Sequence, residues 1–151
     1  MLRCAFTLLT GLLTLLWNGP ALAVSRTFVA TSGLDSNTAT NCGPTTPCRT
    51  FNAALSVTSA GGEVVVLESG GYGPAPVNIT QSVSITAPDG AYAGITVGTG
   101  NGITIATAGV SVRLKGLTLN GNTGAGAAGI LMTNGGRSDD RGQHDQGFPQ
   151  W

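Results

Sequence analysis

Short segments in which apolar and polar residues alternate fill most of the chain from residue 63 to residue 134. Val83 and Ile85, for example, stand two positions apart with a serine between them. Residues two apart on a strand share a face, so this spacing predicts strands with one buried face. Gly, Asn, Pro-Asp or Thr-Gly bounds each segment and predicts a turn. In chain order the predicted strands are EVVVLES, APVNIT, QSVSITA, AGITVG, NGITIAT, VSVRLKGLTLNG and AAGILMTN.

The segment before these strands has a different periodicity, with apolar residues at spacings of three and four. This spacing predicts a short amphipathic helix over about residues 48–60, ended by Gly61 and Gly62. Thr27–Ala30 is a further predicted strand, and residues 32–47 form a polar loop. The residues on the predicted helix face are Phe51, Ala54, Leu55 and Thr58.

The spacing of the predicted strands favours an all-β solenoid. Strands start about every six to thirteen residues, so three strands with their turns occupy roughly twenty residues, the size of one solenoid coil. A coil buries its inward face by stacking on its neighbours, and an open end needs a cap, which the predicted helix supplies. A β-sandwich also has short strands and frequent turns, and a disordered Gly/Thr-rich stalk shares the composition; both stay open.

The N-terminus has the order of a secretory signal peptide: one arginine, an apolar run from Cys4 to Trp17, a break, and the small residues of Ala21–Ala23. The apolar run of about fourteen residues is shorter than the roughly 20 residues of a membrane-spanning helix, the alternative interpretation. We therefore expect residues 1–23 to be removed and the mature protein to begin near Val24. It would be secreted or periplasmic, and its membrane contact would be limited to the cleaved peptide.

Residues 24–136 carry four basic and four acidic side chains. This balance gives no basic patch for phosphates, so we expect no nucleic acid partner. The many Val, Ile and Leu residues indicate a folded chain rather than a disordered one. The charged residues are Arg26, Arg49, Arg113, Lys115, Asp35, Glu63, Glu68 and Asp89.

Two cysteines, Cys42 and Cys48, follow the predicted signal peptide in the segment NCGPTTPC. An even pair in an exported chain predicts a disulfide, here closing a short loop. A metal site is the alternative, but it would need further ligands, and residues 24–136 contain no histidine. We expect no metal and no cofactor.

Taken in order, the segments FVATSGLDSN, PCRTFNAAL, AGGEVVVLESGGYGP, SVSITAP and VRLKGLTLNG resemble a known group. They are similar to the N-terminal half of secreted bacterial right-handed parallel β-helix proteins of the pectin-lyase-like superfamily. The resemblance covers Arg26–Gly136. It implies that the helix at Phe51 caps the first coil, that residues 71–74 form a turn, and that two strands meet at Gly116.

The resemblance implies no catalytic site in this chain. Pectate lyases of the superfamily hold calcium with a cluster of acidic residues and use an arginine as base, and polygalacturonases use three aspartates. Both reactions need several carboxylates at one site. Asp35, Glu63, Glu68 and Asp89 follow neither pattern. We assign no catalytic residue, and enzymatic activity is the less favoured interpretation.

Four side chains are candidates for contact with a glycan. Arg113 and Lys115 are two apart on a predicted strand and would share a face opposite Val112 and Leu114. They could contact a uronate or sulfated sugar, and a solvated outer face is the alternative. The other two candidates are Tyr72 and Tyr92, which lie in predicted turns. Their rings could stack on a sugar, and packing within the turn is the alternative.

The composition changes at Arg137, because residues 137–151 hold five of the fourteen charged side chains and the one histidine. Read one nucleotide forward with permitted codons, this segment can encode approximately DLTIAGSTIKDFP, an alternating strand with a turn. Our hypothesis is a frameshift near codon 136 that replaced the native continuation and truncated the protein. An ordinary polar tail is the alternative. In either case we expect residues 137–151 to be disordered and without function.

The sequence is compatible with three functions of this protein. The leading one is an exported scaffold whose strand faces bind polysaccharide at the cell envelope or outside the cell. The competing one is a fragment of a polysaccharide lyase or glycoside hydrolase whose active face lies in missing C-terminal coils. The third is a product without function, whose uncapped end is prone to self-association.

Overall fold

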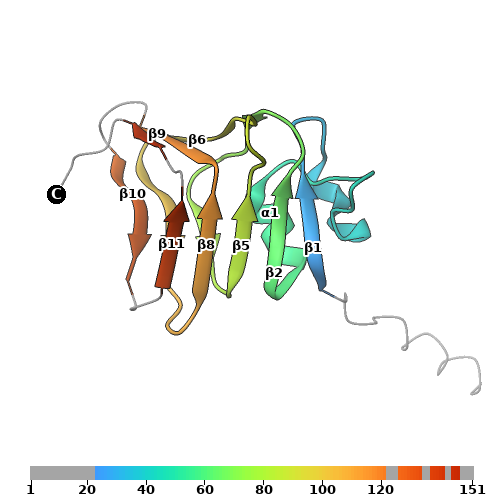
Figure 1. The fold of residues 1–151 in the computed structure, drawn as a ribbon, viewed down its shortest axis with the longest axis horizontal. Coiled ribbons are helices and arrows are strands. Elements are labelled where there is room, and N and C mark those ends of the chain that lie inside the picture. Colours follow the sequence, from blue (N-terminus) through green and yellow to red (C-terminus); the bar gives the residue numbers. More distant parts are fainter. Residues whose placement is uncertain (1–22, 122–125, 134–136, 142–143, 147–151) are drawn as a thin grey trace, which may run out of the picture.

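The computed structural model describes residues 23–121, 126–133, 137–141 and 144–146 (Figure 1). Strands predominate and helices are few in this part of the chain, so the all-β prediction is confirmed. The predicted signal peptide lies outside the described residues apart from Ala23. The helical elements are η1 (Asp35–Thr40) and α1 (Phe51–Val57), and the strands are β1 (Val24–Val29), β2 (Thr58–Val66), β3 (Gly70–Gly71), β4 (Val77–Ile79), β5 (Val83–Thr86), β6 (Ala93–Val97), β7 (Gly100–Ile105), β8 (Ser111–Lys115), β9 (Leu117–Gly121), β10 (Gly126–Met132), β11 (Arg137–Arg141) and β12 (His144–Gln146).

The strands form three parallel sheets. Sheet I has the order β1-β2-β5-β8-β11, sheet II the order β12-β9-β6-β3, and sheet III the order β10-β7-β4. From β2 onward, consecutive strands enter sheets I, II and III in rotation, and we call one such rotation a circuit. Each strand pairs in parallel with its counterpart in the next circuit, as the row β1, β2, β5, β8 and β11 in Figure 1 shows for sheet I.

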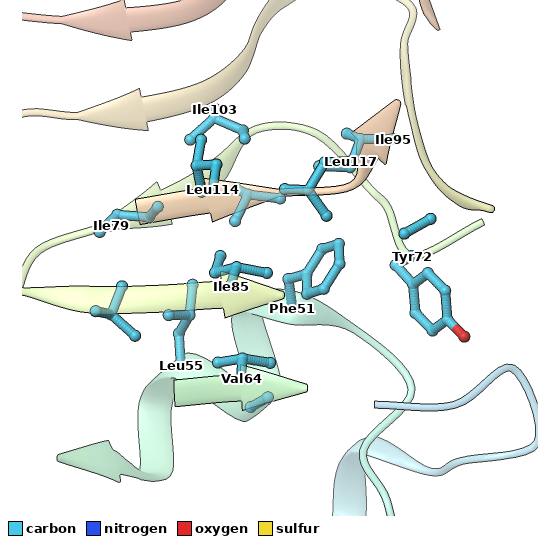
Figure 2. Close-up of a cluster of buried hydrophobic side chains, with 14 of the residues drawn as sticks. Phe51, Leu55, Val64, Tyr72, Ile79, Ile85, Ile95, Ile103, Leu114 and Leu117 are labelled. Atoms are coloured by element: carbon cyan, nitrogen blue, oxygen red, sulfur yellow. The ribbon is translucent and has the colours of Figure 1, made fainter. Parts of the chain in front are cut away.

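Alternation within each strand creates the core. In β8, Val112 and Leu114 are buried while Ser111, Arg113 and Lys115 are exposed, as the sequence pattern predicted. The parallel register then places buried residues of successive circuits in line: Val64 pairs with Ile85, which pairs with Leu114. Figure 2 shows these side chains directed into the interior. Similar columns join Ile79 to Ile105 in sheet III and Ile95 to Leu119 in sheet II.

Gly116 separates β8 from β9, where the resemblance placed the meeting of two strands. Its φ of 72° lies in the left-handed region, which glycine adopts without a side-chain penalty. A Cβ added there would also lie 2.8 Å from the carbonyl oxygen of Ala87 in the previous circuit. The chain therefore turns from sheet I to sheet II at a position that suits glycine alone.

The helix is shorter than the sequence indicated. α1 begins at Phe51, after the Thr50 side chain accepts a hydrogen bond from the Ala53 N–H, and ends at Val57. The expected stop at Gly61 and Gly62 is wrong, because both glycines lie inside β2. Thr58 already has extended backbone angles and pairs with β1, and this pairing, rather than a glycine, ends the helix.

The segment around the cysteines covers the outer edge of sheet I. The Cys42 carbonyl accepts a hydrogen bond of 2.8 Å from the Phe28 N–H. The Cys48 N–H donates to the Phe28 carbonyl at 2.9 Å, and the Cys48 carbonyl accepts from the Ala30 N–H at 3.0 Å. These bonds satisfy backbone groups that an uncovered edge strand would leave open.

Two side chains near α1 reach the first strands of the other sheets. Arg49 Nη1 donates to the Gly71 carbonyl of β3 at 2.7 Å. The Asn52 side chain donates to the Pro76 carbonyl and accepts from the Asn78 N–H, both at 3.0 Å, as a neighbouring strand would. The helix and its flanking residues thus contact the first edge of every sheet, and the buried face of α1 rests on the core.

Part of the segment expected to be disordered lies in strands. β11 pairs in parallel with β8, and β12 pairs with β9. The structure differs from the expectation here because backbone groups make a parallel ladder and need no apolar side chains. The register sets Asp140 beside Leu114 and Asp145 beside Leu119. The remaining tail residues lie outside the described ranges.

Candidate functional site

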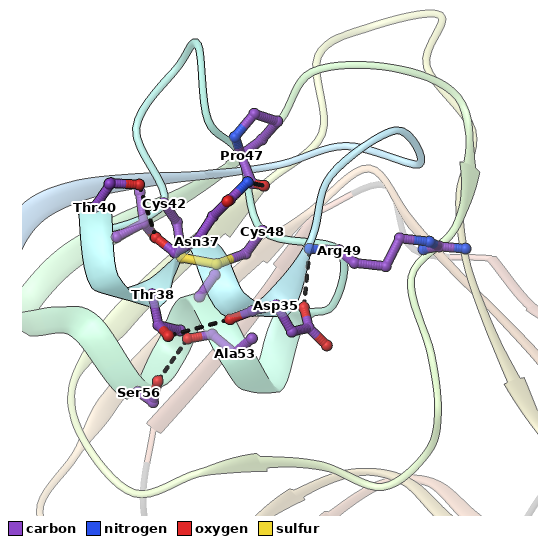
Figure 3. Close-up of a disulfide and its surroundings, with 12 residues drawn as sticks. Asp35, Asn37, Thr38, Thr40, Cys42, Pro47, Cys48, Arg49, Ala53 and Ser56 are labelled. Carbon is purple, nitrogen blue, oxygen red and sulfur yellow. Dashed lines mark hydrogen bonds between the residues drawn. A yellow bond between two sulfur atoms is a disulfide. The ribbon is translucent and has the colours of Figure 1, made fainter.

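The predicted disulfide between Cys42 and Cys48 is confirmed, and both residues are fully buried (Figure 3). Asp35 lies beside it and accepts hydrogen bonds of 2.9 Å from the N–H groups of Arg49 and Thr50. The Thr50 hydroxyl donates to the other carboxylate oxygen at 3.0 Å. This region therefore joins η1, the disulfide loop and α1. The hydrogen bonds of the Asp35 carboxylate hold these segments together.

Tyr72 packs inside the molecule, which agrees with turn packing and not with sugar stacking, the two interpretations of its sequence context. Its side chain is fully buried, with its ring centroid 5.3 Å from that of Phe51 (Figure 2). Its hydroxyl donates to the Glu68 carbonyl. Burial raises the pKa of the Tyr72 phenol, and the nearby Glu68 carboxylate raises it further. Packing of α1 on the first circuit encloses this ring, so a sugar cannot stack on it.

Glu68 is hydrogen-bonded to the chain segment that follows β1. Its carboxylate accepts hydrogen bonds from the Thr31 hydroxyl at 2.5 Å, the Ser32 N–H at 2.9 Å and the Ser32 hydroxyl at 3.2 Å. These donors, the Thr31 hydroxyl first, stabilise the charged form and hold the pKa of Glu68 below its ordinary value. The Glu68 carboxylate therefore stabilises this part of the fold as a charged hydrogen-bond acceptor and is not suited to donate a proton.

Arg113 and Lys115 lie on the outer face of sheet I, opposite the buried Val112 and Leu114. Lys115 Nζ is 3.3 Å from an Asp89 oxygen in the turn after β5, which reduces the positive charge at this corner. The side chain of Asp89 is 93% exposed and that of Lys115 48% exposed. Solvent screens a pair this exposed, so it orders the corner only weakly.

Tyr92 is one of the exposed large apolar residues among the described ones, with 46% of its surface accessible. Three contacts fix its position. Its N–H donates to Ser69 Oγ at 3.0 Å, and its hydroxyl accepts a hydrogen bond of 2.7 Å from Asn120 Nδ2. The ring lies against Gly94, where an added Cβ would overlap it.

An open hollow of about 410 Å³ lies between the turn that carries Tyr92 and the start of β9. It brings together Tyr92 and Asp89 and, through the ion pair, the neighbouring Lys115. Neither Asp89 nor Asn120 was predicted to contact a ligand. Asn120 is 28 positions from Tyr92 in the chain, and only pairing between circuits brings the two side chains together. The hollow is lined by Pro88, Asp89, Gly90, Ala91, Tyr92, Gly116, Leu117 and Thr118.

Three of the acidic residues have separate structural roles. Asp35 and Glu68 bind backbone and hydroxyl donors, and Glu63 is 2.9 Å from Arg26 Nη2 across β1 and β2. Within the described ranges, no three His, Cys, Asp or Glu side chains gather as a metal site would require. None of the described helices is long and apolar enough to cross a membrane.

Comparison with known proteins adds no relative: no protein-family model, curated sequence or solved structure significantly matches this chain.

Proposed function

We propose that this protein is an exported right-handed parallel β-helix of the pectin-lyase-like kind. The rotation of strands through three parallel sheets and the columns of buried residues between circuits support this proposal. Crossovers between parallel strands of one sheet are right-handed in about 98% of cases, which supports the hand. Export is supported by the order of residues 1–23 and by the disulfide, a bond typical of oxidising compartments.

The export proposal can be tested by expressing the full chain in a bacterium and fractionating the cells. We expect the protein in the periplasm or medium, beginning near Val24 by N-terminal sequencing. Mass spectrometry without reduction should give a peptide pair joined through Cys42 and Cys48. A cytoplasmic product that keeps residue 1 would contradict the proposal.

The proposed activity of this scaffold is binding of polysaccharide at the cell envelope or outside the cell. One observation carries it: Tyr92 is exposed yet fixed, at the wall of a hollow that also holds a carboxylate. Aromatic rings with few convergent polar groups are common in ligand sites, and about 410 Å³ is within the range of roughly 300–1,000 Å³ for small-ligand pockets.

A glycan array probed with the labelled full chain tests this proposal. We expect binding to a limited set of polysaccharides, and no release of reducing ends or unsaturated uronates when those polysaccharides are incubated with the protein. An array without any bound glycan would refute the binding function. Release of new chain ends would instead favour the competing lyase or hydrolase function.

A further inference from the structure

The Tyr92 side chain is arranged before any ligand arrives. Its backbone N–H, its hydroxyl and one side of its ring are held by Ser69, Asn120 and Gly94, which belong to three successive circuits. An exposed side chain without such contacts would lose rotational freedom when it bound a ligand. Fixing the ring in advance removes most of that entropic cost.

The space occupied by the ring depends on the register of sheet II. Gly71 pairs with Gly94, and Gly94 pairs with Thr118, so two glycines and a threonine follow one another across the sheet. Gly94 precedes the outward, exposed Thr96 by two positions and therefore shares its face. The missing side chain at Gly94 leaves room for the Tyr92 ring to lie along the outer surface rather than project from it.

Hydrogen-bonding groups border the exposed aromatic surface. Asn120 donates to the Tyr92 hydroxyl, which therefore keeps its own hydrogen for an acceptor. The Asp89 carboxylate, 93% exposed, can accept hydrogen bonds from hydroxyl groups. Thr118 lies in the lining with a hydroxyl that can do both. An apolar face with donors and acceptors at its margin matches a pyranose ring, whose C–H face is apolar and whose rim carries hydroxyls.

Among the residues that line the hollow, the charged one is Asp89. Lys115 Nζ lies 3.3 Å from Asp89, so this neighbouring cation already has an anionic partner. A uronate placed against Tyr92 would meet the Asp89 carboxylate as a like charge, which disfavours binding. The same carboxylate favours an uncharged sugar by accepting its hydroxyl hydrogens.

We propose that Tyr92 stacks on one pyranose ring of a neutral polysaccharide, seated in the hollow between residues 88–92 and the start of β9. This inference rests on the proposed function and names its substrate class. Asp89 binds hydroxyls of the same ring and discriminates against acidic sugars. Asn120 is a positioning residue, because it acts on the sugar through the Tyr92 hydroxyl.

Titration calorimetry with the full chain tests the proposal, using cellohexaose, mannohexaose, laminarihexaose and hexagalacturonate as probes. We expect at least one neutral hexasaccharide to bind more tightly than hexagalacturonate. Tyr92→Ala should weaken that binding about tenfold, and Tyr92→Phe should retain most of it because the ring remains. Leu67→Ala, which removes a comparably exposed apolar side chain outside the hollow, should leave it unchanged.

Asp89→Asn provides an independent readout of the charge argument. It leaves Lys115 without its carboxylate partner, so we expect tighter binding of hexagalacturonate than in the wild type. Thermal melting of each variant checks that the fold persists. The proposal is overturned if no neutral hexasaccharide binds, or if Tyr92→Ala and Leu67→Ala behave alike. Glycans bound on the array without dependence on Tyr92 would remove this site but keep the proposed function, whereas an empty array would remove both.

Discussion

The Asp35 carboxylate holds the start of α1 from a position well before it in the chain. Its acceptors are matched to the N–H groups of Arg49 and Thr50 and to the Thr50 hydroxyl. Thr50 is the N-cap of α1 and Arg49 precedes it, and a negative charge is favourable at this end of a helix. Asp35 therefore fixes α1 against η1, in addition to the local cap that Thr50 provides.

Asp35→Ala should lower the free energy of unfolding by about 1.5–3 kcal/mol, the range for hydrogen bonds to charged groups. Asp35→Asn, which keeps one acceptor, should cost less. Urea denaturation followed by circular dichroism measures both. Asp89→Ala is the matched control, because the Asp89 side chain is almost fully exposed, and it should change stability little. Equal effects of the two alanine variants would contradict the role of Asp35.

Glu68 makes stability depend on pH in a defined direction. Its pKa is lower in the folded protein because of the donors at Thr31 and Ser32. A group with a lowered folded pKa stabilises the protein above its unfolded pKa, and this contribution is lost as the pH falls through the folded pKa. The effect thus belongs to acidic conditions, below the ordinary pKa of a glutamate.

We expect the melting temperature of the wild type to fall more steeply under these acidic conditions than that of Glu68→Gln, which cannot titrate at this position. Thr31→Val removes the first of the donors and should move the pKa of Glu68 back toward its ordinary value. Melting curves recorded across acidic pH test this, with carbon-13 NMR of the glutamate carboxyl as a direct readout. Parallel pH profiles for wild type and Glu68→Gln would refute it.

At the scale of elements, the corner between β8 and β9 combines two demands on one residue. Gly116 has a positive φ and lies close to the Ala87 carbonyl of the previous circuit. Gly90 also has a positive φ, of 87°, but nothing lies within 4 Å of an added Cβ there. Substituting Gly90 therefore tests backbone strain alone, and substituting Gly116 tests backbone strain together with close packing between circuits.

Gly90→Ala should destabilise the protein by about 1–2 kcal/mol through backbone strain alone. Gly116→Ala should cost more, because the new methyl group must also displace the backbone at Ala87. Chemical denaturation of the two variants gives the comparison. An equal loss in both would mean that adjacent circuits move apart easily at this corner.

Alternation was sufficient to predict strands such as β8, because Val112 and Leu114 record their burial directly in the sequence. Contacts between circuits left no such local signal. Tyr72 and Tyr92 have similar neighbours in the chain, yet one is enclosed by α1 and the other lies over Gly94. Likewise, only pairing with β1 shows that Thr58 belongs to a strand. The disulfide was predictable because it closes a short loop whose two ends are both visible in the sequence.

The register of β11 with β8 and of β12 with β9 shows where the alternation of apolar and polar residues ends. Asp140 and Asp145 pair with Leu114 and Leu119, the buried residues of the preceding circuit. The register thus places acidic residues at positions where the preceding circuit has buried leucines. This break in the pattern coincides with the change of composition at Arg137.

At the scale of the whole molecule, the N-terminal cap blocks the first edge of each sheet. Arg49 contacts β3, Asn52 contacts β4, and the disulfide loop contacts β1. Exposed edges of parallel sheets are templates for pairing with other chains. The cap therefore occupies backbone groups that another chain could pair with at this end, and it encloses the core with Phe51 and Leu55.

The double variant Arg49→Ala/Asn52→Ala should self-associate in a concentration-dependent way, because it opens two of these edges while keeping the disulfide. Size-exclusion chromatography with light scattering measures the molar mass over a range of concentrations. Arg26→Ala, which removes an exposed arginine that covers no edge, should match the wild type. A double variant with the mass of the wild type at every concentration would show that these two side chains do not protect the edges.

Pairing between adjacent circuits also allows such a chain to fold one circuit at a time. The stretch of chain that must close to add a circuit does not grow with the number of circuits already formed, so the entropic cost of each addition stays nearly constant. The cap and β1 come first in the sequence and offer a finished surface to β2, which then offers one to β5. A polypeptide that emerges N-terminus first from a ribosome or a translocation channel can therefore grow its structure from the leading end while later residues are still inside.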